Sequence, residues 1–125
     1  MDLTTFALKI TDLTERLRVP DGGFSVRDDG TDASAGFAVS TMPECGTELV
    51  FATELDILTY LTAHAGQLLP GYVFGGWHDP ISGRIYLDIS ELVDDLDEAL
   101  VLAAEHDQLA VYDLDAHESV RPVLA

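Results

Sequence analysis

Basic side chains are scarce in this sequence, and their scarcity excludes several classes of function. Twenty-three acidic residues face six basic ones, Lys9 is the single lysine, and the formal net charge is −17. From Ile85 to Val120 there are eleven acidic residues and no lysine or arginine. Proteins that bind DNA or anionic membranes replace counter-ions with Lys and Arg side chains. We therefore expect no direct nucleic-acid or membrane binding, and an attraction toward basic protein surfaces.

Cysteine is scarce, and long apolar runs are missing. Cys45 is the single cysteine, so no internal disulfide can form. The apolar runs are far shorter than the stretch of about 20 residues that spans a membrane. The first residues, MDLTTFALKITDL, have neither a basic head nor a continuous apolar segment, which argues against a secretory signal. These absences predict a cytoplasmic protein.

The composition is otherwise that of a folded chain. A length of 125 residues, of which 47% are hydrophobic, fits a single domain (residues 1–125) that buries a core without disulfides or metals. Glycines and prolines stand between apolar runs, and there is no repeat and no low-complexity tract.

Three stretches show the spacing of amphipathic helices. The first runs from Leu3 to Leu17, with apolar residues three or four positions apart. The second begins with Thr53 and Asp56, a weaker form of the capping box. The third begins at Asp94 or Asp95 as the N-cap, with an acidic residue of the first turn completing a capping box. The predicted buried stripes of the second and third helices are Leu55, Leu58, Leu61, Ala65 and Leu68, and Leu96, Leu100 and Ala103.

Strands are predicted where apolar residues alternate between turn signals. A first β-hairpin pairs residues 23–28 with 35–39, and a second pairs 72–77 with 85–90 across an Asp-Pro-Ile-Ser-Gly turn. Further strands are expected at residues 47–51 and 109–114, and a short polar tail is expected at the end. The predicted fold is α+β, with about three helices on one face of a mostly antiparallel sheet, in the order α-β-β-(β)-α-β-β-α-β.

No motif for catalysis or metal binding is recognisable. The four histidines lie in different predicted elements, without the paired spacing of a metal site. Cys45 follows Glu44, and a neighbouring carboxylate raises a thiol pKa, which opposes activation. Nucleophile elbows and phosphate-binding or dinucleotide-binding glycine loops are missing. We expect no enzymatic activity, no cofactor and no metal; the enzymatic alternative is a small enzyme that uses His78, Asp79 or His106.

The acidic residues of the last third are the main functional candidates. Four of them fall at the start of the third predicted helix, where the helix dipole stabilises negative charge. The other seven between Asp88 and Glu118 have no such explanation and repel one another. The alternative is that the acids serve solubility or reflect a high-salt or GC-rich source. The predicted partner-binding acids are Asp88, Glu91, Asp94, Asp95, Asp97, Glu98 and Glu105.

Trp77 is the aromatic residue most suited to an interface. It follows Gly75 and Gly76, a pair that indicates a bulge or a close approach of the backbone. The tyrosines of the predicted strands are expected to pack within the protein, as strand aromatics usually do. We therefore add Trp77 to the predicted partner-binding residues.

Two segments carry a resemblance to known proteins. GGWHDPISGRIYLD (residues 75–88) and EHDQLAVYDL (residues 105–114) resemble small acidic proteins of actinobacteria and their phages, a group that implies no particular activity. Within the first segment, Gly75, Trp77 and Asp79 are similar to part of the acidic antirestriction proteins of mobile elements. That second resemblance implies mimicry of DNA.

These observations favour a non-enzymatic protein that binds a basic protein surface. One hypothesis is a phage or mobile-element inhibitor that mimics DNA, whose duplex carries one charge per about 1.7 Å of its axis. Its partner would be a nucleic-acid-handling enzyme with a basic groove. The alternative is an immunity-type or regulatory protein dedicated to one basic partner. The two hypotheses differ in breadth, because a mimic should block several DNA-binding proteins.

Overall fold

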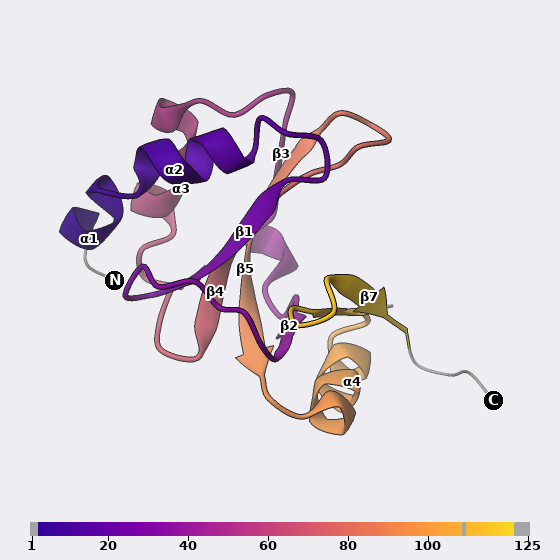
Figure 1. Ribbon diagram of the computed structural model, residues 1–125. Coiled ribbons are helices and arrows are strands. Elements are labelled where there is room, and N and C mark those ends of the chain that lie inside the picture. The colour runs from indigo at the N-terminus through magenta and orange to yellow at the C-terminus, as the bar shows by residue number, and fades with distance from the viewer. Residues whose placement is uncertain (1–2, 109, 122–125) are drawn as a thin grey trace.

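A computed structural model describes residues 3–108 and 110–121, which form four α-helices and one seven-stranded sheet (Figure 1). The predicted α+β class is confirmed. The elements are α1 (Leu3–Ala7), α2 (Ile10–Arg16), β1 (Gly23–Arg27), β2 (Phe37–Val39), a short 3₁₀ helix (Pro43–Cys45), β3 (Thr47–Leu49), α3 (Glu54–Ala63), β4 (Tyr72–His78), β5 (Ile85–Val93), α4 (Leu96–Glu105), β6 (Val111–Asp113) and β7 (Glu118–Val120). Hydrogen-bonded neighbours follow the order β1-β4-β5-β2-β6-β7, β3 also pairs with β5, and all of these pairs are antiparallel. No helix in the described ranges has the length and apolar character needed to cross a membrane.

The main core lies between helices α2 and α3 and strands β1, β4 and β5. The predicted second hairpin is confirmed as β4 and β5, and the short strand expected near residue 47 is confirmed as β3. On β5, Leu87 and Ile89 are buried on the face that the sequence alternation indicated. Phe74 of β4 contacts the rings of Phe24 and Tyr60, with centroid separations of 5.0 and 5.2 Å. These aromatic contacts join strands β1 and β4 to helix α3.

A second core lies between helix α4 and strands β2 and β6. Ala103 is fully buried, as predicted, and so is Ala99, whereas Leu96 and Leu100 are half-buried at its edge. The two alanines let the helix approach the strands closely. Val93 packs against this cluster, and it faces the same side of β5 as the residues of the main core, because side chains alternate along a strand. All three of the longer helices therefore cover one face of the sheet.

The first predicted helix is divided in two. α1 ends at Ala7, α2 begins at Ile10, and the Lys9 N–H donates to the Phe6 carbonyl at 2.8 Å in the turn between them. The prediction of one continuous helix is therefore wrong. Phe6, Ile10 and Leu13 are still buried together, because the i→i−3 turn between the two helices keeps nearly the same apolar face toward the core.

The first predicted hairpin does not form. Its turn is present, since the Arg27 N–H donates to the Thr31 carbonyl at 2.8 Å and Gly30 has a φ of 83°. The returning chain, however, meets β1 only in an isolated bridge between Val26 and Asp32. β1 pairs instead with β4, and β2 pairs with β5 and β6. Alternation identifies an extended segment but not its partner, which here is decided by the long β4–β5 hairpin at the centre of the sheet.

The buried face of α3 also differs from the predicted stripe. The capping box is confirmed, because the Thr53 hydroxyl accepts the Asp56 N–H at 3.2 Å and the Asp56 carboxylate accepts the Thr53 N–H at 2.9 Å. Leu55 and Leu58, predicted to be buried, are exposed. The helix has two apolar stripes, and only one of them can face the core. The stripe that faces the core includes Tyr60, whose hydroxyl donates to the buried Cys45 carbonyl at 2.6 Å. The buried residues of α3 are Ile57, Tyr60 and Leu61.

The end of the described chain forms one strand more than predicted. β6 falls within the expected strand, of which Leu109 lies outside the described residues. The segment predicted as a polar tail forms β7, which is antiparallel to β6. The Asp113 carboxylate accepts the N–H groups of Asp115 and Ala116 at 3.0 and 3.1 Å, and so builds the turn. The pattern missed this hairpin because polar turn chemistry builds it, without apolar alternation in β7.

Candidate functional site

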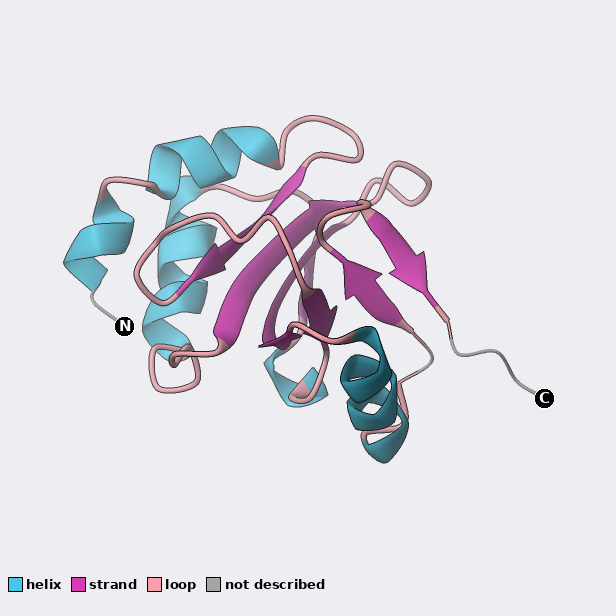
Figure 2. Cartoon of the chain, turned by 60° about the horizontal axis from the view of Figure 1, so that its bottom comes forward, coloured by secondary structure: helices cyan, strands magenta, loops and turns pink. Residues whose placement is uncertain are grey.

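The sheet is hollowed on the face opposite the helices. A cavity of about 690 Å³ lies there, between strands β1, β4 and β5 on one side and β6 and β7 on the other. Figure 2 shows the last two strands, next to the C-terminus, set at an angle to the central strands. The cavity lining includes many small side chains, among them Ser25, Ser40, Gly75 and Ser90. Because these residues fill little space, they leave the sheet surface open at its centre.

Asp88 lines this cavity from strand β5 and is half-buried. Its cross-strand neighbour is Gly75, and a Cβ at that position would lie 2.5 Å from Asp88 Oδ1. The glycine therefore makes room for the carboxyl group. Burial raises the pKa of Asp88 to about 6, against a smaller opposing effect of its hydrogen bond with Ser90.

Trp77 and the glycine before it both line the cavity. A Cβ on Gly76 would lie 2.6 Å from the Phe24 ring, so the close approach expected of the glycine pair is confirmed. Trp77 lines the cavity and is 43% exposed. Its Nε1–H donates to the Asp21 carboxylate at 2.9 Å, and its ring stacks on Tyr86 with a centroid separation of 6.3 Å. These contacts hold the indole in place while leaving it accessible.

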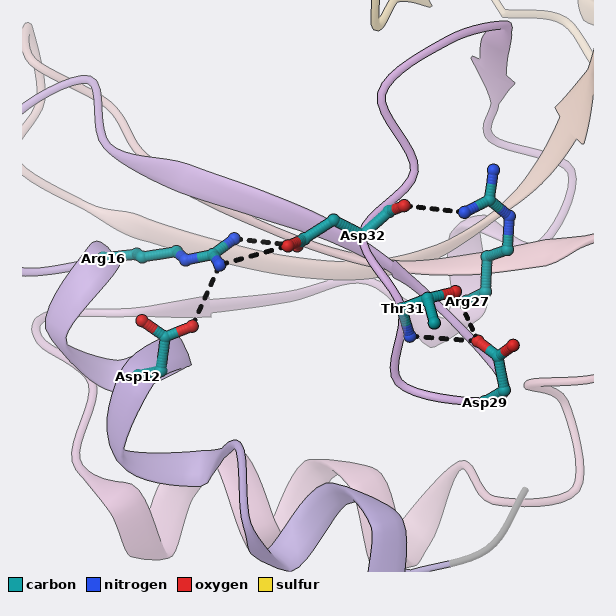
Figure 3. A network of polar contacts seen from close by, with 6 residues as sticks. All are labelled: Asp12, Arg16, Arg27, Asp29, Thr31 and Asp32. Atoms are coloured by element: carbon teal, nitrogen blue, oxygen red, sulfur yellow. Dashed lines mark hydrogen bonds and ion pairs between the residues drawn. The ribbon is translucent and has the colours of Figure 1, made fainter.

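An ion-paired network borders the cavity beside β1 (Figure 3). Arg16 Nη1 lies 2.9 Å from Asp32 Oδ1, and Arg16 Nη2 lies 2.9 Å from Asp12 Oδ2. Arg27 donates to the Asp32 carbonyl at 2.6 Å. The hydrogen bond from Arg16 holds the pKa of Asp32 below its usual range. Of the described residues that line the cavity, Arg16 is the one lysine or arginine, and two carboxylates already engage it.

The predicted partner-binding acids occupy different places in the structure. Asp88 belongs to the cavity, and Glu91 is half-buried further along β5. The remaining five, which we call the acidic face, are exposed around helix α4: Asp94, Asp95, Asp97, Glu98 and Glu105. Asp95 is the N-cap and accepts the Glu98 N–H at 2.9 Å, so one half of the predicted capping box is present. The structure thus separates Asp88 from the exposed acids with which the sequence grouped it.

The acidic face carries charge that the described chain does not neutralise. Among residues 3–108 and 110–121, the ion pairs join Arg16 to Asp12 and Asp32, and Arg84 to Glu48. None of these pairs includes an acid of the segment from residue 88 to residue 118. The helix dipole explains the acids at the start of α4, but Glu105 stands in the last turn, where the dipole disfavours a negative charge.

The residues of the enzymatic alternative have structural contacts. His78 Nδ1 lies 2.8 Å from the Leu17 carbonyl, and Asp79 accepts the Ile81 N–H at 2.9 Å in the β4–β5 turn. His106 is exposed at the C-cap of α4. Cys45 is buried, and burial together with the Glu44 charge raises its thiol pKa, the direction predicted. Within the described ranges, no three His, Cys, Asp or Glu residues are grouped so as to hold a metal ion.

Sequence reasoning named Asp88 and Trp77 but missed the cavity that joins them. Its walls come from strands that are distant in the sequence, and their pairing was not predicted. One local signal was present: Asp88 and Ser90 alternate with the buried residues of β5, so polar side chains face the side of the sheet without helices.

Comparison with known proteins adds no assignment: no protein-family model, no curated protein and no solved structure matches the chain.

Proposed function

We propose that this protein is a non-enzymatic binding protein whose acidic face docks on a basic surface of another protein. The observation that carries the proposal is the absence of ion pairs on these five carboxylates in the described chain, in contrast to the paired acids beside β1. Exposed like charges lower the stability of the folded state. A cationic partner would relieve that repulsion and would be attracted from a distance.

The placement of the acids around α4 favours a binding role over a purely structural one. Asp95 caps the helix, and Asp97 and Glu98 benefit from the dipole at its first turn. Glu105 and Asp107 lie at the opposite end, roughly 15 Å away by the rise of a ten-residue helix, where acids gain nothing for folding. Negative charge at both ends gives the helix a length of anionic surface that a basic groove could follow.

A phage or mobile-element inhibitor that mimics DNA is the form of this function that we propose first. The partner would then be a nucleic-acid-handling enzyme, and the acids would take the place of backbone phosphates. The second form is an immunity-type or regulatory protein with one dedicated basic partner. The two forms differ in the number of proteins that they bind. A mimic should compete with duplex DNA for several unrelated DNA-binding proteins. A dedicated protein should compete with DNA for one such protein or for none.

The test is capture of partners at low and high salt, with matched charge variants. The triple variant Asp97→Asn/Glu98→Gln/Glu105→Gln removes three charges from the acidic face and leaves the N-cap intact. The control, Glu15→Gln/Glu44→Gln/Glu54→Gln, removes three exposed charges from the other half of the chain. We expect a basic protein that the wild type and the control retain at low salt and release at high salt. The triple variant should bind that purified partner at least about tenfold more weakly. Equal binding by the two triple variants would contradict the proposal.

A further inference from the structure

We propose that the cavity on the open face of the sheet binds a single protonated amine or guanidinium group, with Asp88 as its counter-ion. The ligand is a small organic ammonium ion or a lysine or arginine side chain of a partner protein. The cavity volume, about 690 Å³, falls within the range of roughly 300–1,000 Å³ that is typical of small-molecule sites. It therefore has room for the alkyl chain of such a ligand as well as for its charged end.

The strands around Asp88 are arranged to admit its carboxyl group. Gly75 stands opposite, and a Cβ there would come within 2.5 Å of Asp88 Oδ1. Ser90, the next residue on the same side of β5, is buried and hydrogen-bonds to the carboxyl group. A carboxyl group is thus accommodated at the centre of a sheet face where an apolar side chain would pack more easily.

The charges that surround the cavity select a cation. Asp88, Asp21 and Asp32 line it, and the single arginine of its described lining, Arg16, already pairs with Asp12 and Asp32. An anionic ligand would meet Asp88 without a free positive charge to compensate. A cation would instead give this half-buried carboxylate a partner of opposite charge.

Burial makes Asp88 responsive to such a ligand. Its pKa of about 6 means that it is mostly ionised at pH 7, although its surroundings solvate the charge poorly. An isosteric amide would avoid that penalty. The carboxylate at this position therefore lowers the stability of the fold, and a bound cation would offset that cost.

The aromatic and apolar lining of the cavity suits the rest of the ligand. Trp77 and Tyr112 line it, and both rings remain partly exposed at 43% and 39%. Aromatic faces attract ammonium and guanidinium groups and also pack against alkyl chains. Val73 and Leu114 add an apolar wall. The combination of a half-buried carboxylate, aromatic rings and an apolar wall matches an alkylammonium or alkylguanidinium ion.

The first experiment uses free cations with the full-length protein. Amide chemical shifts are followed during titration with n-butylammonium, n-butylguanidinium and the uncharged control 1-butanol. We expect saturable shifts at Ser25, Gly75, Ser90 and the Trp77 indole with the two cations. Butanol should bind at least about tenfold more weakly. Equal effects of butanol, or shifts confined to the acids of α4, would overturn the proposal.

Variants assign the binding to the cavity carboxylate. Asp88→Asn should weaken cation binding at least about tenfold, whereas Glu44→Gln, at an exposed position outside the cavity and the acidic face, should leave it unchanged. If Asp88→Asn does not fold, the wild type gives the same information through pH. Its affinity for the cations should fall below about pH 6, as Asp88 takes up a proton.

The charged and titratable groups that face Asp88 across the cavity are Asp21, Asp32, Arg16, Tyr112 and His117. The pH series is therefore repeated in His117→Gln, and a pH-independent affinity in that variant would contradict the role of Asp88.

That the cation is a side chain of a partner protein rests on the proposed function. The experiments nevertheless distinguish failure of the cavity proposal from failure of the proposed function. If Asp88→Asn weakens both the free cation and the basic partner, a partner side chain enters the cavity. If it weakens the free cation alone, the cavity is a small-molecule site. Partner binding that needs the acidic face, without any binding of free cations, would overturn the cavity proposal and leave the proposed function standing. The reverse result would overturn the proposed function alone.

Discussion

Asp88 differs from the other acids of the C-terminal segment in what surrounds it. The five carboxylates of the acidic face are exposed to water, whereas the Asp88 carboxyl lies on the sheet and faces a cavity. Burial raises its pKa from 3.8 to about 6. The folded protein therefore binds this proton more tightly than the unfolded chain does, so ionisation of Asp88 lowers stability.

The substitution Asp88→Asn should stabilise the protein at neutral pH. In the wild type, the contribution of Asp88 to stability falls as pH rises from about 4 to about 6 and then stays low, because the folded-state pKa is the higher one. A rise of about two pKa units corresponds to roughly 2–3 kcal/mol, at about 1.4 kcal/mol per unit. Urea unfolding at pH 4.5 and pH 8 should show the variant gaining about 2 kcal/mol relative to the wild type between these conditions.

Asp97→Asn, at an exposed position, is the control for this measurement. Its stability relative to the wild type should change little with pH. A pH-independent difference between Asp88→Asn and the wild type would show that the Asp88 carboxyl is not buried in the way described.

At the scale of single elements, strand β4 shows how a glycine pair serves two faces at once. Gly76 lies against the Phe24 ring in the main core, and Gly75 lies against the Asp88 carboxyl in the cavity. Each position requires glycine, because the Phe24 ring or the Asp88 carboxyl already occupies the space that a Cβ atom would take. Helix α4 shows a different compromise, because small alanines form its buried face while its exposed face carries acids together with Val101.

The two glycines should respond differently to alanine. Gly76→Ala brings a methyl group within 2.6 Å of two ring carbons of Phe24, and we expect a loss of about 1–3 kcal/mol because a packed aromatic ring cannot move freely. Gly75→Ala meets the end of a short side chain, and its cost should be smaller in an Asp88→Ala background. Urea unfolding of the single and double variants measures both effects. Gly66→Ala, which would meet no atom within 4 Å, is the control; equal costs at all three glycines would refute this account.

At the scale of the whole molecule, electrostatic repulsion is the dominant feature. The net charge is −17, and the ion pairs within the described residues use only two of the arginines. The core that opposes this repulsion is made of two main clusters on one face of the sheet. The strongly anionic surface therefore lowers the free energy of unfolding.

Salt should raise the melting temperature. Screening shortens the range of repulsion to about 10 Å at 0.1 M ionic strength and to about 3 Å at 1 M. We expect Tm to increase between 20 mM and 500 mM NaCl, as followed by circular dichroism. The increase should be smaller in Asp97→Asn/Glu98→Gln/Glu105→Gln, which carries less repulsive charge. A Tm that falls with salt would mean that attractive ion pairs dominate instead.

Much of the fold follows from local patterns. The alternation of β5, the turn before it and the Thr53–Asp56 capping box all depend on neighbouring residues, and the structure confirms them. The partner of β1, the buried face of α3 and strand β7 were not predicted correctly. Each depends on which distant segment is available for pairing or packing, and periodicity carries no information on that choice.

Composition and short-range spacing were enough to predict the α+β class, the central hairpin and the excess of acids. They also indicated the close approach at Gly75 and Gly76 and the interface character of Trp77. The position of Asp88, away from the exposed acids and in a cavity with Trp77, depends instead on how distant strands pack together. That outcome requires β1, β4 and β5 to face β6 and β7, and such an arrangement is set by long-range strand pairing. The same acid in the same strand would be an ordinary surface carboxylate if the last hairpin were packed elsewhere.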